Sequence, residues 1–254
     1  MKKILVTFIV LIFFAKVNSF DALAQDFEIT PLNEHFFQVL GDDQTRTVYN
    51  QLKNYNQDGS TFIQITDLQN RVVKTIQTAI NPQKGYLEEV TEVFDPNGDL
   101  VMRKEENKEN TRVLTFYYEN GVQVGHVVYR GNNDYEIWRM SGNNRYKSKR
   151  DDFQPNLFPD DKAWRKFLLN ELRFLSEAQK QGHEGTVILA FLIDKNGQRV
   201  KTEVANPDDL PELLTNEALR VGELFRGNYT PAINYNGETV EGWLYLPVGF
   251  YFYR

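Results

Sequence analysis

Histidines and carboxylates are the side chains of this sequence that could do acid–base or metal chemistry. The chain has three histidines, His35, His126 and His183, and no cysteine. Metal sites and catalytic dyads need such groups at defined spacings, which no pair of these histidines has. The HExxH motif, the G-x-S-x-G nucleophile elbow and the glycine-rich phosphate-binding motifs do not occur in the sequence. The sequence therefore predicts no catalytic residue, no metal ligand and no cofactor.

Three acidic patterns come closest to a site. The stretch DPNGD at 95–99 resembles half of a calcium loop, but its glycine comes two positions too early for such a loop. His183 and Glu184 are adjacent on a predicted turn, where neighbouring side chains point apart. The paired carboxylates at 42–43, 151–152, 160–161 and 208–209 are sequence neighbours, whereas glycoside hydrolysis needs two carboxyls that face each other across a cleft. We therefore expect that the protein is not an enzyme.

The N-terminus has the pattern of a secretory signal peptide. Lys2 and Lys3 precede a 12-residue apolar region at 4–15, and Ala22-Leu23-Ala24 offers a cleavage site before Gln25. An uncleaved anchor is the alternative, but a membrane span needs about 20 residues. We expect cleavage after Ala24 and a location in the periplasm or outer cell envelope.

Composition restricts the partners of the mature chain. Cleavage would remove three positive charges and one negative charge, so the formal net charge would change from −6 to −8. An acidic protein is a poor match for nucleic acid or an anionic membrane surface. Without cysteine the chain has no disulfide and no thiolate metal site. We expect a protein partner and neither nucleic acid nor metal.

Residues 26–150 show the pattern of β-hairpins. The 254-residue chain has 18 Phe, 13 Tyr and 3 Trp, residue types that favour strands. Asn97-Gly98 and Asn120-Gly121 lie between apolar or aromatic runs, and such pairs are typical of type I′ hairpin turns. This spacing, with "TFYYENGVQVGHVVY" as its best example, resembles the MORN-variant repeats of bacterial envelope proteins. A polar connection at 131–159 follows, of which we take 151–159 as the linker between two domains.

From residue 160 the pattern changes to a small α+β layer. Trp164, Leu168, Leu172 and Ala178 predict one helix that ends at Gly182. The unbroken apolar run at 187–193 predicts a strand that is buried on both faces. A hairpin strand at 200–204, a helix with its apolar stripe at 214–225 and a last strand from 240 to about 253 complete the order α-β-β-α-β. The expected fold class is α+β, with β-hairpin repeats followed by an antiparallel sheet with two helices.

The segment from 155 to 254 resembles the C-terminal domain of TonB-type proteins, in the version frequent in Bacteroidetes-like envelopes. The resemblance rests on the order of "FPDDKAWRKFLLNELRFLSEAQKQGHEGTVILAFLIDKNGQRV", "ELLTNEALRVGELF" and Leu246-Pro247-Val248-x-Phe250. It implies a domain at 160–254 that binds an extended peptide of an envelope protein, for example an outer-membrane transporter. The chain departs from the family at Phe174-Leu175 and Tyr229-Thr230-Pro231, and its prolines are scattered rather than gathered in a spacer.

The resemblance also implies where the partner would bind. β-Strand addition uses the edge of a sheet, and the last strand is the candidate edge. The residues that we expect to contact a partner are Val240, Glu241, Trp243, Tyr245 and Pro247. On a regular strand Trp243 and Tyr245 share one face, which we predict to be the contact face. The alternatives are that this strand belongs to the core or pairs with its copy in a homodimer.

Two other functions stay open. The repeat region could be the working part of a structural or scaffolding protein, with its β-surface binding the ligand and the C-terminal domain serving for docking. An uncleaved N-terminus would make the chain a small anchored transducer of the TonB type.

Overall fold

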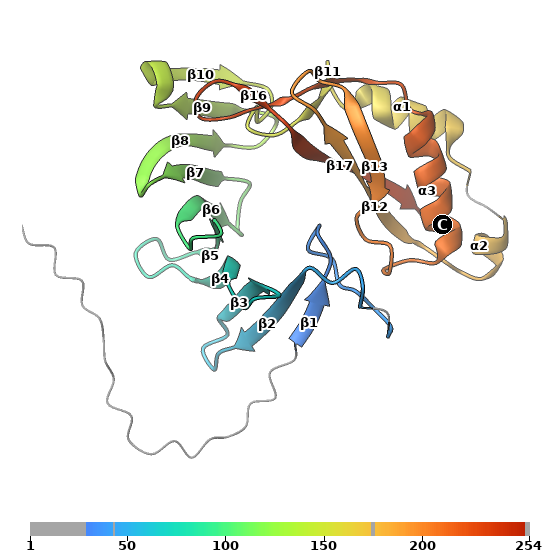
Figure 1. Ribbon diagram of the computed structural model, residues 1–254, viewed down its shortest axis with the longest axis horizontal. Helices are drawn as coiled ribbons and strands as arrows, with labels where there is room; N and C mark the ends of the chain where they lie inside the picture. Colours follow the sequence, from blue (N-terminus) through green and yellow to red (C-terminus); the bar gives the residue numbers. More distant parts are fainter. Residues whose placement is uncertain (1–28, 43, 174–175, 252–254) are drawn as a thin grey trace, which may run out of the picture.

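A computed structural model describes residues 29–42, 44–173 and 176–251 of the chain. It shows a long, curved antiparallel sheet and a smaller part with helices, which lies against the inner side of that curve (Figure 1). The predicted α+β class is thus confirmed. The predicted signal peptide at 1–24 lies outside the described residues.

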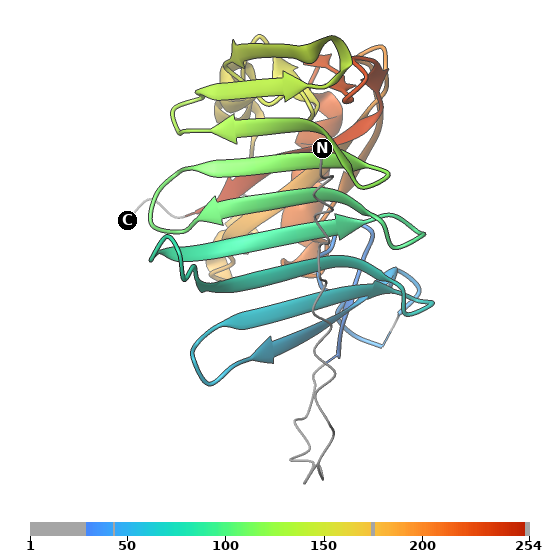
Figure 2. The same cartoon turned by 90° about the vertical axis from the view of Figure 1, so that its left-hand side faces the viewer.

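The first part is a meander of ten strands that pair in chain order. Figure 2 shows these strands side by side, from the N-terminal to the C-terminal edge of the sheet. They are β1 (Ile29–Leu32), β2 (Tyr49–Tyr55), β3 (Thr61–Asp67), β4 (Val72–Ile80), β5 (Leu87–Phe94), β6 (Leu100–Asn107), β7 (Val113–Glu119), β8 (Val122–Tyr129), β9 (Tyr135–Arg139) and β10 (Asn144–Ser148).

The two predicted hairpin turns form, by different geometries. Asn120 and Gly121 both have positive φ, 50° and 74°, as a type I′ turn requires. At the other turn only Gly98 has positive φ, and its N–H donates to the carbonyl of Asp95. The Asp95 carboxylate accepts the N–H groups of Asn97 and Asp99, which stabilises this longer turn.

The predicted polar connection at 131–159 is wrong for its first half. Residues 135–148 form β9 and β10 and extend the sheet. Ile137 is fully buried, whereas Glu136 and Trp138 on either side are only partly buried, so the stretch has the alternation of a strand. Two Gly-Asn-Asn stretches obscure that pattern, because they mark the turns that flank β9.

The second part has a three-stranded antiparallel sheet in the order β13-β12-β17. Its strands are β12 (Gly185–Ile193), β13 (Arg199–Val204) and β17 (Gly242–Phe250), and helix α3 (Glu212–Leu224) packs on it. β12 is the central strand, with Leu189, Ala190 and Phe191 all fully buried. The prediction that this run is covered on both faces is therefore confirmed.

The predicted leading helix is shorter than expected. Helix α1 covers Lys162–Glu171, and the short α2 covers Ser176–Lys180. Leu172 is already extended, with ψ of 127°, and the N–H of Arg173 donates to Glu217 of α3. Because this N–H bonds to Glu217 and not to a carbonyl of α1, the helix ends here, although the apolar periodicity of the sequence continues beyond its end.

Two short ladders complete the second part. β11 (Asn156–Phe158) pairs with β14 (Asn228–Thr230), and β15 (Ala232–Ile233) pairs with β16 (Thr239–Val240). The last strand is therefore not continuous from residue 240, because Val240 pairs with Ala232 and β17 begins only at Gly242.

The hydrophobic core lies between the three-stranded sheet and its helices. Phe191 of β12, Trp164 of α1 and Phe225 after α3 meet there, with Trp164 in edge contact with both phenylalanine rings. Burial of each such large side chain contributes about 1.5–3 kcal/mol. The core thus fixes β12 and β17 as a rigid base.

Both ends of the meander contact the second part. At one end, Arg139 is 5% exposed and donates to the backbone oxygens of Ile233 and Asn234. At the other end, the side-chain amide of Asn33 donates to the carbonyl of Ala205, and Arg46 pairs with Asp208. Figure 1 shows these two contact regions at the top and bottom of the curved sheet.

Candidate partner-binding edge

The predicted contact residues lie on two different elements. Trp243, Tyr245 and Pro247 are in β17, Val240 is in β16, and Glu241 is the exposed residue between them. β17 pairs with β12 on one side, and among the described residues no strand pairs with its other side. The structure thus places three of the five residues together on an edge strand, and the short β16 ladder takes Val240 away from it.

Hydrogen bonds of β12 determine which backbone groups of β17 point outward. Ile188 directs its N–H to the side chain of Asn206 and its carbonyl to the N–H of Ala205, both on the β13 side. The backbone N–H and carbonyl of successive residues point to opposite sides of a strand, and in an antiparallel pair two opposite residues point either both toward each other or both away from each other. β12 and β17 pair over nine residues without a bulge, so this rule holds along the whole ladder. Since Ile188 is opposite Pro247 and Ala190 opposite Tyr245, the backbone groups of Trp243, Tyr245 and Pro247 point away from β12.

The two ends of this edge are flanked by other elements. The indole N–H of Trp164 donates to the carbonyl of Pro247, at 3.3 Å, which independently supports the outward direction of that carbonyl. A proline is tolerated here because an edge position needs no inward N–H. At the other end Pro155 packs on Gly242, where an added Cβ would lie 3.0 Å from the proline ring. The free stretch of the edge is therefore centred on Trp243 and Tyr245.

The side-chain face that carries these two residues is occupied in part by the N-terminal segment. His35 is 7% exposed, and its Nδ1 lies 3.0 Å from the hydroxyl oxygen of Tyr245. Its ring also contacts Trp243 edge-on, with 4.8 Å between ring centroids. Lys201 covers the Trp243 ring, at 5.4 Å from the centroid. The predicted contact face is thus covered over Trp243, while Tyr245 keeps 44% exposure.

Glu34, His35 and Glu203 form the one cluster of the described residues with metal-ligand types in range, within 4.8 Å of one another. Both ring nitrogens of His35 have partners, since Nε2 donates to Glu203 at 2.5 Å. Lys201 pairs with both glutamates. Burial raises the pKa of the Glu203 carboxyl, but hydrogen bonds from Lys201 and His35 outweigh it and leave that pKa below its usual value. The cluster is a closed ion-pair network that connects the N-terminal segment to β13.

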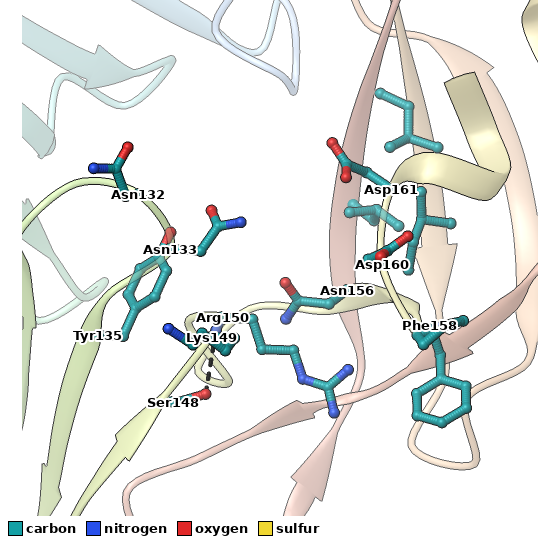
Figure 3. Close-up of a pocket in the computed structure, with 14 residues that line it drawn as sticks. Asn132, Asn133, Tyr135, Ser148, Lys149, Arg150, Asn156, Phe158, Asp160 and Asp161 are labelled. Atoms are coloured by element: carbon teal, nitrogen blue, oxygen red, sulfur yellow. Dashed lines mark hydrogen bonds between the residues drawn. The ribbon is translucent and has the colours of Figure 1, made fainter. Parts of the chain in front are cut away.

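A pocket of about 730 Å³ adjoins β17. In Figure 3 it lies between Asn132 and Asn133 on one side and Asp160 and Asp161 on the other. Its lining comes from the β8–β9 turn, the end of β10, β11, the start of α1 and β17. The residues are Asn132, Asn133, Tyr135, Ser148, Lys149, Arg150, Asn156, Leu157, Phe158, Pro159, Asp160, Asp161, Leu244 and Leu246.

The other two histidines do not join a common site with His35. The ring of His126 stacks on that of Trp138 in the meander, with 5.3 Å between centroids, and burial lowers the pKa of His126. His183 lies between α2 and β12. The three histidines therefore occupy three separate regions.

Residues 170–252 match the family model described as Gram-negative bacterial TonB protein C-terminal. This segment is a TonB-type C-terminal domain. The family is one of non-enzymatic protein-interaction domains in the periplasmic part of bacterial envelope proteins, which typically interact with outer-membrane proteins. No curated protein and no solved structure shows significant similarity to the chain. Among the described residues, no helix has the length and apolar character to cross a bilayer.

The TonB-type domain includes β12, β13, α3 and β17, and the match begins within α1. Sequence reasoning located its edge strand but missed His35, Lys149 and Arg150, which lie close to that strand in space. His35 differs from an ordinary histidine by its burial, which is not visible in the sequence, and Lys149 and Arg150, which are not buried, have no sequence pattern that separates them from other surface cations.

Proposed function

We propose that the protein is a non-catalytic interaction protein of the cell envelope, whose TonB-type domain binds an extended peptide of a membrane partner. The peptide adds as a strand to the outer edge of β17. The observation that supports this most directly is the outward direction of the backbone groups of Trp243 and Tyr245 on a strand without a second neighbour.

Strand addition gives affinity through the main chain and specificity through alternate side chains. Each added backbone hydrogen bond contributes about 0.5–1.5 kcal/mol. An outward N–H and an outward carbonyl at both Trp243 and Tyr245 offer up to four such bonds. The other edge of the same sheet is less suitable, because β13 has six residues and carries Arg199 and Lys201, and charged edge residues discourage pairing.

A proline at position 245 tests this proposal. Tyr245→Pro removes an outward N–H and the hydroxyl that is bonded to His35, but no hydrogen bond to β12, so circular dichroism of the variant should stay native. By the same alternation, the N–H of Thr202 in β13 points away from β12, which makes Thr202→Pro the matched control.

The mature protein on beads should capture a specific protein from detergent-solubilised envelope. Tyr245→Pro should lose this capture, and Thr202→Pro should retain it. Capture of that protein by natively folded Tyr245→Pro would overturn the proposal.

Export by a cleaved signal peptide belongs to the same proposal. Mass spectrometry of the protein from the periplasm should find Gln25 as the first residue. A mature chain that begins at Met1 would favour the anchored transducer instead.

A second candidate function, in which the meander binds the ligand, is favoured by one observation. A recess of about 460 Å³ lies on its inner face, lined among others by Lys104, Tyr117, Tyr129 and Tyr135. Lys104→Glu tests this function by a single substitution. Deletion of the whole meander would be a poorer test, because it would also remove His35 from Trp243 and Arg46 from Asp208. Loss of partner capture by Lys104→Glu, with capture retained in Tyr245→Pro, would favour the meander.

A further inference from the structure

The pocket beside β17 has walls from both parts of the molecule. Leu244 and Leu246 of β17 line one side, whereas Asn133 in the β8–β9 turn and Lys149 and Arg150 after β10 belong to the meander. Arg139 holds this end of the meander against Ile233 and Asn234. The meander therefore forms part of the surroundings of the edge strand.

An added strand would place side chains in this pocket. Neighbouring strands lie about 4.7–4.9 Å apart, and side chains alternate between the two faces of a sheet. On one face the peptide residues would lie beside Trp243 and Tyr245, where His35 already packs. On the other face they would lie beside Leu244 and Leu246, which line the pocket. Every second side chain of the peptide thus enters a space bounded by the meander.

The charges around the pocket are not equivalent. Asp160 pairs with Lys162, and Asp161 pairs with Arg165, so both acids have a cation of the chain as partner. Among the residues that the structure describes, Lys149 and Arg150 have no ion-pair partner, and the guanidinium of Arg150 lies over the ring of Phe158 at 5.9 Å. The uncompensated charge at the pocket is therefore positive, beside the partly exposed Leu244 and the largely buried Leu157 and Leu246 of the pocket lining.

From these contacts we propose that the meander selects the peptide. Its segment 148–150 binds a carboxylate side chain of an acidic, extended peptide that pairs with β17, and the adjoining leucines take up apolar side chains of the same peptide. This inference rests on the proposed strand addition. It implies that the ten-stranded sheet is a specificity element of the TonB-type domain.

Peptide selection by phage display on the mature full-length protein tests the inference. The expected result is enrichment of peptides with Asp or Glu at every second position next to apolar residues. With the double variant Lys149→Glu/Arg150→Glu as target, the enriched peptides should change to basic ones. For a selected acidic peptide, the affinity should fall about fivefold for each carboxylate replaced by amide, the upper range for an exposed ion pair.

Two controls separate the inference from the proposal on which it rests. Enrichment of the same acidic peptides on the charge-reversed variant, with loss of binding by Tyr245→Pro, would overturn the role of the meander and leave strand addition intact. Unchanged binding of these peptides to Tyr245→Pro would overturn strand addition itself. Failure to enrich any peptide would contradict both. Arg145→Glu, an exposed change on β10 outside the pocket lining, should leave the selected peptides unchanged.

Discussion

The Nδ1 atom of His35 lies 3.0 Å from the hydroxyl oxygen of Tyr245, although 210 positions separate the two residues in the chain. This contact joins the loop after the first strand of the meander to the last strand of the TonB-type domain. It means that the strand proposed to receive the partner is stabilised by the N-terminal segment on its side-chain face, while its backbone edge stays free.

Removal of the His35 ring should destabilise the fold. In His35→Ala, Tyr245 and Glu203 each lose a hydrogen-bond partner and Trp243 loses an edge contact, at a cost of about 2–4 kcal/mol. Urea unfolding followed by Trp fluorescence measures the change. Glu34→Gln is the matched control, because the Glu34 side chain is 52% exposed and lies 3.7 Å from Lys201. It should change stability by less than about 0.5 kcal/mol. Equal effects of the two variants would show that His35 does not hold the segment.

Asp151 should make the protein less stable as the pH rises from about 4 to 6. Burial raises the pKa of the Asp151 carboxyl to about 6, above the value of about 4 in an unfolded chain. The folded state therefore binds the proton more tightly, and this stabilisation is present below pH of about 4 and lost as the pH passes 6. Asp151→Asn should raise the free energy of unfolding at pH 7.5 by on the order of 3 kcal/mol and leave it nearly unchanged at pH 4.

Asp208 is the control, because its effect on stability should depend on pH in the opposite direction. Burial raises the pKa of its carboxyl, but the hydrogen bonds from Arg46 and the Leu40 N–H outweigh this, and the pKa lies below its usual value. Its stabilisation is present above the unfolded pKa and is lost as the pH falls. Asp208→Asn should therefore lower stability at pH 7.5. A pH profile in which both variants shift stability in the same direction would contradict these assignments.

Arg139 should be irreplaceable by lysine. Its guanidinium donates to two backbone oxygens and to Asp152 at once, and a lysine ammonium cannot reproduce this planar arrangement. We expect Arg139→Lys to cost about 3 kcal/mol, measured as a lower thermal midpoint. Arg145→Lys in the neighbouring strand, with its side chain 61% exposed, should leave the midpoint within about 1 °C. A midpoint of Arg139→Lys equal to that of Arg145→Lys would show that this junction contributes little.

Local patterns predicted much of the fold. Asn120-Gly121 specifies its hairpin through the positive φ of two adjacent residues, and the apolar run of β12 indicates a covered strand without knowledge of its neighbours. Such features depend on contacts between residues close in sequence, so they can be read from the chain.

The site was less predictable because its contacts are distant in sequence. The end of α1 depends on a hydrogen bond between Arg173 and Glu217, and the break before β17 depends on the pairing of Val240 with Ala232. The occupation of the Trp243 face depends on His35. None of these pairs produces a periodic pattern in the sequence. The sequence of β17 alone shows which of its residues share a face, but it does not show which other segment covers that face.

Residue-resolved amide hydrogen exchange of β17 tests strand addition most directly. In the free protein the N–H of Leu244 and Leu246, which pair with β12, should exchange slowly, and those of Trp243 and Tyr245 should exchange fast. A bound peptide selected by display should slow the exchange of Trp243 and Tyr245 and leave Leu244 and Leu246 unchanged. If Trp243 and Tyr245 keep their fast exchange in the saturated complex, the peptide does not pair with β17 and the account is wrong.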